Sequence, residues 1–144
     1  MFSKRYVPNV LSKKDKIKQK KELMKSIKAY KKGNYYVRDK VDYPNKRSKW
    51  YNKTKKKYNL NDEEMNLSQL SKATKCKKSS LKQVIRKGMG AYYSSGSRPN
   101  QTPQSWGIAR LYSAISGGPA YKYDQSILKK GCKSKSKIFK IIKK

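Results

Sequence analysis

Apolar residues recur at helical spacing in several stretches of the chain, and this pattern predicts a mostly α fold. The first stretch predicts a helix over 12–32. Ser12 fits its N-cap, Asp15 stands at the capping-box position and favours the helix dipole, and Gly33 would end the helix. Its second half has an apolar stripe made of Leu23, Met24, Ile27 and Tyr30. Its first half is mostly lysine, so this helix cannot bury a wide face.

Two shorter helical patterns lie between residues 66 and 87, separated by a polar turn. Their apolar positions are Leu67, Leu70 and Ala73, then Leu81, Val84 and Ile85. Ser79 or Ser80 fits the N-cap of the second helix. The layout has the rhythm of a helix-turn-helix, whose second helix enters the major groove of DNA, but any αα-hairpin gives the same pattern. The basic residues that would contact phosphates here are Lys77, Lys78, Lys82, Arg86 and Lys87.

The neutral segment, residues 88–120, has no lysine and no acid. Its only basic residues are Arg98 and Arg110, and it holds six of the eight glycines and three of the five prolines. Turn-forming residues predict a loop or short hairpin in its first half. Such a long gap in a lysine-rich chain indicates a constraint other than solubility.

The second half of the neutral segment predicts a helix over 103–116. Thr102 fits the N-cap, and the proline after it fits the first turn. Gly117 or Gly118 would take the left-handed C-cap, and Pro119 would stop the helix. The apolar stripe consists of Ile108, Leu111, Tyr112 and Ile115, with Trp106, Ala109 and Arg110 beside it.

Three interpretations compete for the glycine-rich loop. In the first, the glycines make tight turns and Tyr92, Tyr93 and Trp106 form a small core. In the second, backbone N–H groups form an anion cradle with the side chains of Ser94, Ser95, Ser97 and Arg98. The third, a catalytic serine, has no His or Lys base in the segment. The first two are compatible, because Arg98 and Arg110 can both brace the loop and meet an anion.

The remaining stretches give weaker patterns. Residues 34–60 read as an irregular arm in which tyrosines and Trp50 alternate with basic residues, suited either to stacking on bases or to packing on a helix. The acids at 62–64 favour a helix start. A last short helix is expected over 124–130, capped by Gly131. The tail after it is expected to be mobile, with apolar docking residues Ile138, Phe139, Ile141 and Ile142.

The charge of the chain limits the classes of function that fit this sequence. The 144 residues include 39 Lys and Arg against 8 Asp and Glu, a net charge of +31. Two basic wings, with 28 basic residues in 1–87 and 9 in 122–144, flank the neutral segment. A field of this size attracts polyanions. Neither an apolar run long enough to span a membrane nor a secretory signal is present in the sequence.

Catalytic and metal chemistry have few residues to use. The chain has no histidine and few carboxylates, so we expect no enzyme activity, no catalytic residues, no metal and no cofactor. Cys76 and Cys132 lack the spacing of a zinc site. The two cysteines would allow a single disulfide, but a lysine-rich intracellular protein more often keeps both thiols reduced.

The central motif GAYYSSGSRPNQTPQSWGIARLYSAISGG resembles the signature of an uncharacterised family of small basic proteins from giant nucleocytoplasmic DNA viruses, with distant relatives in tailed phages. The N-terminal stretch YVPNVLSKKDKIKQKKELMKSIKAYKKGNYY extends the resemblance over most of the chain. It implies a viral origin and brings no catalytic residues. The positions that match the motif are Gly88, Gly90, Ser95, Arg98, Pro99, Trp106, Ala109 and Arg110.

The sequence therefore predicts a small, mostly α single domain with a helix-turn-helix-like hairpin, a Gly-rich loop and a Trp-bearing helix. Its parts would be a lysine-rich helix and arm (1–60), a compact core (61–131) and a basic tail (132–144). We expect a virus-encoded, non-enzymatic protein that binds DNA or RNA through phosphates, in the virion or the infected cell. The alternative is a structural virion component contacting acidic capsid proteins, an anionic membrane surface or the genome; no small-molecule substrate is evident.

Overall fold

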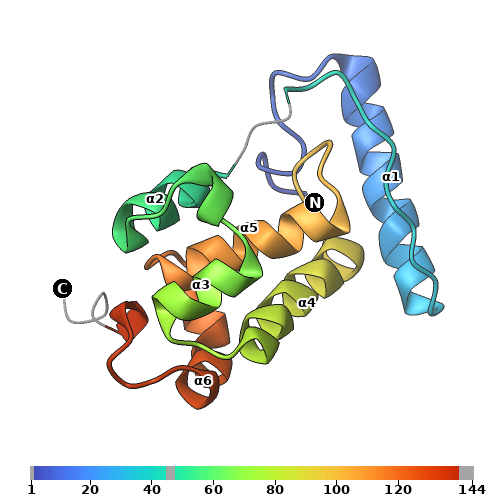
Figure 1. The fold of residues 1–144 in the computed structure, drawn as a ribbon. Coiled ribbons are helices and arrows are strands. Elements are labelled where there is room, and N and C mark those ends of the chain that lie inside the picture. Colours follow the sequence, from blue (N-terminus) through green and yellow to red (C-terminus); the bar gives the residue numbers. More distant parts are fainter. Residues whose placement is uncertain (1, 45–47, 140–144) are drawn as a thin grey trace. The chain divides into compact units, whose positions relative to one another are not determined.

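The computed structural model describes residues 2–44 and 48–139, and their fold is mostly helical (Figure 1). No β-strand forms within these ranges, apart from an isolated bridge between Cys76 and Cys132. The small, mostly α domain predicted from the sequence is confirmed. The elements are α1 (Lys13–Lys31), α2 (Lys49–Tyr58), the 3-10 turn η1 (Asp62–Glu64), α3 (Leu67–Thr74), α4 (Lys78–Ser94), α5 (Pro103–Ile115) and α6 (Ala120–Gly131).

Contacts within the chain divide it into two compact units. The first unit is made of Met1–Lys46 and Met89–Trp106, and the second of Arg47–Gly88 and Gly107–Lys144. Each unit is thus discontinuous in sequence, and both α4 and α5 contribute residues to both units. The stretches 1–60, 61–131 and 132–144 expected from the sequence are therefore not the stretches that these contacts group together.

In the first unit, α1 has nearly the predicted bounds of 12–32. The Ser12 hydroxyl accepts a hydrogen bond from the Asp15 N–H at 3.1 Å, and Gly33 follows the helix with a φ of +84°. The buried side is narrow and mostly polar: it consists of Gln19, Glu22, Leu23 and Ser26. Since so little of α1 faces a core, most of its surface is left to charged side chains.

The chain after α1 runs back along this helix in the opposite direction (Figure 1). The Tyr36 hydroxyl donates to Glu22 at 2.7 Å, and the Lys18 ammonium donates to the Lys40 carbonyl at 2.9 Å. A small apolar cluster joins the start of the chain to α1 and to this returning segment; its buried members are Val7, Leu11, Leu23 and Val41.

The second unit holds the larger hydrophobic core. Its fully or almost fully buried members include Leu81, Val84, Leu111, Ile115 and Leu128. The expectation of an irregular arm over 34–60 is wrong for the end of that stretch, because α2 forms there. Ser48 caps α2, and Asn59 ends it in the left-handed conformation. The tyrosines explain the helix, because Tyr51 and Tyr58 are buried in the core.

The expectation of a loop or short hairpin at the start of the neutral segment is also wrong, because α4 covers it. Helix α4 begins at Lys78, so that Ser79 and Ser80 lie inside it rather than capping it, and continues through Gly88 and Gly90 to Ser94. A Cβ on Gly88 would lie 2.6 Å from the Gly107 Cα in α5. This glycine therefore serves close contact between two helix backbones, and the turn interpretation overlooked that use.

Replacing Gly88 with alanine is expected to lower the free energy of unfolding by about 1–3 kcal/mol, because the new methyl group would overlap backbone that cannot rotate away. Gly90 is the matched control on the same helix. A Cβ there meets nothing within 4 Å, so Gly90→Ala should be neutral or stabilising by up to about 1 kcal/mol. Urea unfolding of both variants measures the difference, and equal effects would contradict the close-contact explanation.

The predicted helix over 103–116 is confirmed as α5. The Thr102 hydroxyl accepts from the Ser105 N–H at 3.0 Å, and the Ser105 hydroxyl accepts from the Thr102 N–H at 2.9 Å. Gly117 follows with a φ of +85°. Pro119, expected to stop this helix, instead stands at the N-cap of the next helix, α6. Helix α6 is longer than the predicted 124–130.

The tail and the cysteines differ from expectation. Ser136 and Ile138 are buried, and Ile138 belongs to the core, whereas Ile141 and Ile142 lie outside the described residues. The expectation of two reduced thiols is wrong for this structure, in which Cys76 and Cys132 form a disulfide across 56 residues. In the chain-entropy view, closing such a loop stabilises the fold by about 4 kcal/mol.

Candidate nucleic-acid interface

Helix α1 carries a stripe of lysines on its outer side. Nine of its 19 residues are lysine. Five of them follow one another in alternating steps of four and three residues, the spacing that keeps side chains on one face of a helix. We call this set the lysine stripe; it consists of Lys14, Lys18, Lys21, Lys25 and Lys28, all exposed. At about 1.5 Å of rise per residue, neighbouring ammonium groups are about 5 Å apart along the helix.

Few carboxylates compensate the stripe. Lys18 lies 3.7 Å from Asp39, a contact between two exposed groups that contributes little. Glu22 faces the buried side, where its carboxylate accepts hydrogen bonds from the Tyr36 hydroxyl and the Asp39 N–H. Lys25 lies over the Tyr36 ring at 4.6 Å. The stripe is therefore a row of mostly uncompensated positive charge.

A second cationic feature of the first unit surrounds Trp106. The Cζ atom of Arg98 lies 5.8 Å from the centre of the indole, and that of Arg5 lies 5.2 Å from it. The ring of Tyr6 packs edge-on against the same indole at 6.1 Å. Two guanidinium groups thus share one aromatic ring, an arrangement that suits planar and anionic ligands.

The loop that presents Arg98 is held rigidly. Gly96 has a φ of +115°, and a Cβ on it would meet the Leu23 side chain at 2.9 Å. Asn100, with a φ of +65°, accepts a hydrogen bond from the Val41 N–H and donates to the Val41 and Tyr43 carbonyls. The Asn100 hydrogen bonds tie the backbone after Arg98 to residues 41–43, and the backbone before Arg98 leaves no room for a side chain at Gly96.

Arg98 itself is half-buried and its Nε is a buried donor with no hydrogen-bond partner among the described residues. Burial, and next the nearby charge of Arg5, lower the pKa of the Arg98 guanidinium. A cation that is partly desolvated, near a second cation and short of one acceptor gains from an anion at this place.

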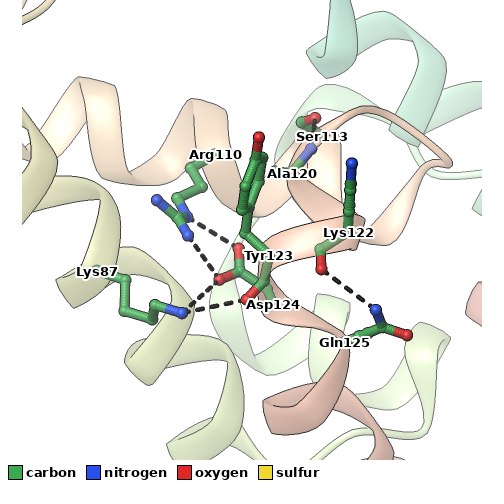
Figure 2. Close-up of polar contacts among 8 residues, drawn as sticks. All are labelled: Lys87, Arg110, Ser113, Ala120, Lys122, Tyr123, Asp124 and Gln125. Atoms are coloured by element: carbon green, nitrogen blue, oxygen red, sulfur yellow. Dashed lines mark hydrogen bonds and ion pairs between the residues drawn. The ribbon is translucent and has the colours of Figure 1, made fainter.

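Arg110 has a different environment in the second unit. Its guanidinium donates to both oxygens of Asp124, from Nε at 2.9 Å and from the terminal nitrogen at 2.8 Å. Lys87 lies 3.3 Å from the same carboxylate and donates to the Tyr123 carbonyl (Figure 2). Asp124 is fully buried. Arg110 and Lys87, both predicted to bind an anion, therefore already have one within the chain; whether they bind another stays a prediction.

A family of unknown function, DUF5824, matches residues 3–131 of the chain. The chain belongs to this family. No curated protein and no solved structure matches the chain. In the described part of this DUF5824 chain, no helix has the length and apolar character needed to cross a membrane, and no group of three metal-ligating side chains occurs.

The other predicted site residues of the DUF5824 chain lie in separate places. Ser94 and Ser95 are exposed at the end of α4, whereas Ser97 is buried, accepts from Arg38 and donates to the Arg98 carbonyl. Lys77, directly before α4, and Lys78, Lys82 and Arg86 on that helix are exposed in the second unit. Among the motif positions, Pro99 is buried and Ala109 is half-buried.

Sequence reasoning missed Arg38. It is buried against the Tyr92 ring at 3.7 Å and donates to Ser26, Ser97 and the Tyr92 carbonyl at 2.6–2.8 Å. Burial lowers the pKa of its guanidinium. One signal was present: arginine is rare in this chain, six against 33 lysines, and only arginine offers several fixed donors from one side chain.

Proposed function

We propose that this chain is a non-enzymatic protein that binds nucleic acid, chiefly through its phosphates. The lysine stripe of α1 carries the proposal. It presents five exposed ammonium groups in one row, and lysine acts as a point charge suited to phosphate rather than to the edges of bases. The eight acids of the chain can neutralise at most eight of its 39 cations.

The pair of arginines at Trp106 supports the same function in the first unit. A guanidinium binds a phosphate through two parallel hydrogen bonds, so Arg98 and Arg5 are the residues best suited to contacts of fixed geometry. The half-buried rings of Tyr6 and Trp106 beside them suit stacking on an unpaired base. Lysines then supply affinity and arginines supply orientation.

A viral origin belongs to the same proposal. The motif around Arg98 and Trp106 resembles that of proteins from giant DNA viruses, and such a virus packages a genome whose charge needs counterions. The chain would then act in the virion or in the infected cell, on the genome or its transcripts. The sequence has no histidine and few acids, which supports a binding role without catalysis.

A salt titration tests the proposal. Five phosphate contacts from the stripe alone give a plot of log Kobs against log salt with a slope of about −4 to −5 on double-stranded DNA. Fluorescence anisotropy with labelled DNA and RNA, from about 50 to 300 mM salt, measures this slope. An absence of binding at the lowest salt, or an affinity indifferent to salt, would contradict the proposal.

A further inference from the structure

A hollow beside the Cys76–Cys132 disulfide in the second unit adjoins a second, smaller hollow. The larger has a volume of about 550 Å³ and the smaller about 280 Å³, and they share Lys77, Lys130 and Gly131. Among the described residues, the lining of the larger hollow has no Asp or Glu. Its lining includes five lysines, all exposed: Lys72, Lys75, Lys77, Lys130 and Lys133.

The disulfide and the backbone bring these lysines together from two distant stretches. The Lys77 N–H donates to the Gly131 carbonyl at 2.8 Å, and the Lys133 N–H donates to the Lys75 carbonyl at 3.0 Å. These two hydrogen bonds flank the disulfide on either side. Stretches 72–77 and 130–133 are thereby fixed at one place, although more than fifty residues separate them.

The arrangement has an electrostatic cost. Five like charges around one hollow repel one another. Lys75 is held at the hollow by the end of α3, where it is the C-cap in the left-handed conformation, with a φ of +59°. An anion in the hollow would relieve the repulsion. The smaller hollow adds hydroxyl and amide donors from Ser79, Ser80, Ser126 and Gln83.

We propose that this hollow is a binding site for closely spaced phosphate groups, and that the closed disulfide assembles it. The volume falls in the range of small-ligand sites, which suits a short run of phosphates. Such a run can come from a nucleic-acid backbone or from a free polyphosphate. The site shares no residue with the lysine stripe of α1, so it stands or falls separately from the function proposed above.

Inorganic tripolyphosphate is the first probe. Calorimetry gives its affinity for the full chain, and amide shifts of residues 75–77 and 131–133 in NMR spectra locate it. Replacing the lining lysines Lys75, Lys77 and Lys133 with glutamine should weaken binding about tenfold or more. The matched control replaces three exposed lysines elsewhere, Lys4, Lys40 and Lys56, and should change affinity by less than about twofold. Equal losses in both variants overturn the site.

A short single-stranded oligonucleotide is the second probe. It is titrated into a chain whose five stripe lysines are glutamine, so that any remaining binding does not involve the lysine stripe. Sensitivity of either probe to the three lining lysines supports the site and identifies the source of the phosphates. Insensitivity of both probes overturns it, while leaving the α1 proposal to its own salt titration.

The role of the disulfide is tested by reduction with a dithiol. Each cysteine sulfur gains one hydrogen, and the dithiol loses two to become a disulfide. Affinity for tripolyphosphate should fall about tenfold, as in the lysine variant. The measurement is repeated on the Cys76→Ser, Cys132→Ser chain in sucrose, which stabilises the folded state, with circular dichroism as the check on folding. Unchanged affinity in a folded, disulfide-free chain overturns this part.

Discussion

Replacing Asp124 with asparagine is expected to lower the free energy of unfolding by about 3–5 kcal/mol. The carboxylate is fully buried and accepts from two nitrogens of Arg110, with Lys87 beside it. Asparagine keeps the shape but removes the charge and directs N–H groups at a guanidinium that is itself mostly enclosed. Two cations then lose their shared partner, and water replaces it poorly.

Asp39 provides the control for this prediction. Its pair with Lys18 is longer, at 3.7 Å, and both side chains are exposed, so Asp39→Asn should change stability by no more than about 0.5 kcal/mol. Urea unfolding at neutral pH compares the two variants. A loss below about 1 kcal/mol for Asp124→Asn would mean that the buried carboxylate is not what holds α4, α5 and α6 together in the second unit.

Removing the lysine stripe is expected to have the largest effect on nucleic-acid binding. With all five stripe residues changed to glutamine, the slope of log Kobs against log salt should become shallower by about 4 to 5, close to one unit for each lost phosphate contact. Glutamine has nearly the helix propensity of lysine, so α1 should persist. Anisotropy with labelled DNA gives the slope, and circular dichroism gives the helix content.

The control for the stripe keeps the net charge of the variant but scatters the substitutions. It replaces five exposed lysines on different elements with glutamine: Lys4, Lys40, Lys56, Lys122 and Lys137. The slope should then change by about one or less, because few of these groups would contact phosphates at the same time. If both variants lose the same slope, total charge rather than the α1 row governs binding.

Local signals in the sequence were sufficient for the helices that carry their own end markers. Ser12 and Gly33 bound α1, and Thr102 and Gly117 bound α5, as predicted. The errors share a cause. Gly88 and Gly90 looked like turn residues because nothing local shows that Gly88 lies against another helix. Helix α2 has no apolar stripe beyond its aromatics, so its place in the core depends on distant partners.

The candidate sites also divide into residues that local sequence shows and residues whose distant partners it does not show. The stripe lysines were visible as a lysine-rich helix, and Arg98 was visible as an arginine in a neutral segment. The partners of Arg38, Arg110 and Cys76 were not, because each lies at least 12 residues away and spacing alone does not identify it. A chain this rich in lysine nevertheless uses arginine sparingly, and two of its arginines, Arg38 and Arg110, each donate several hydrogen bonds.

The covalent link between Cys76 and Cys132 has a consequence for how the chain reaches its fold. Once the disulfide has formed, the stretch 76–132, which contains α4, α5 and α6, is a closed covalent loop with a linear arm at each end. The loop stays closed even when every helix has unfolded. An unfolded oxidised molecule therefore has a shorter end-to-end reach than its reduced counterpart, and the two segments beside the sulfurs need no diffusive search to meet.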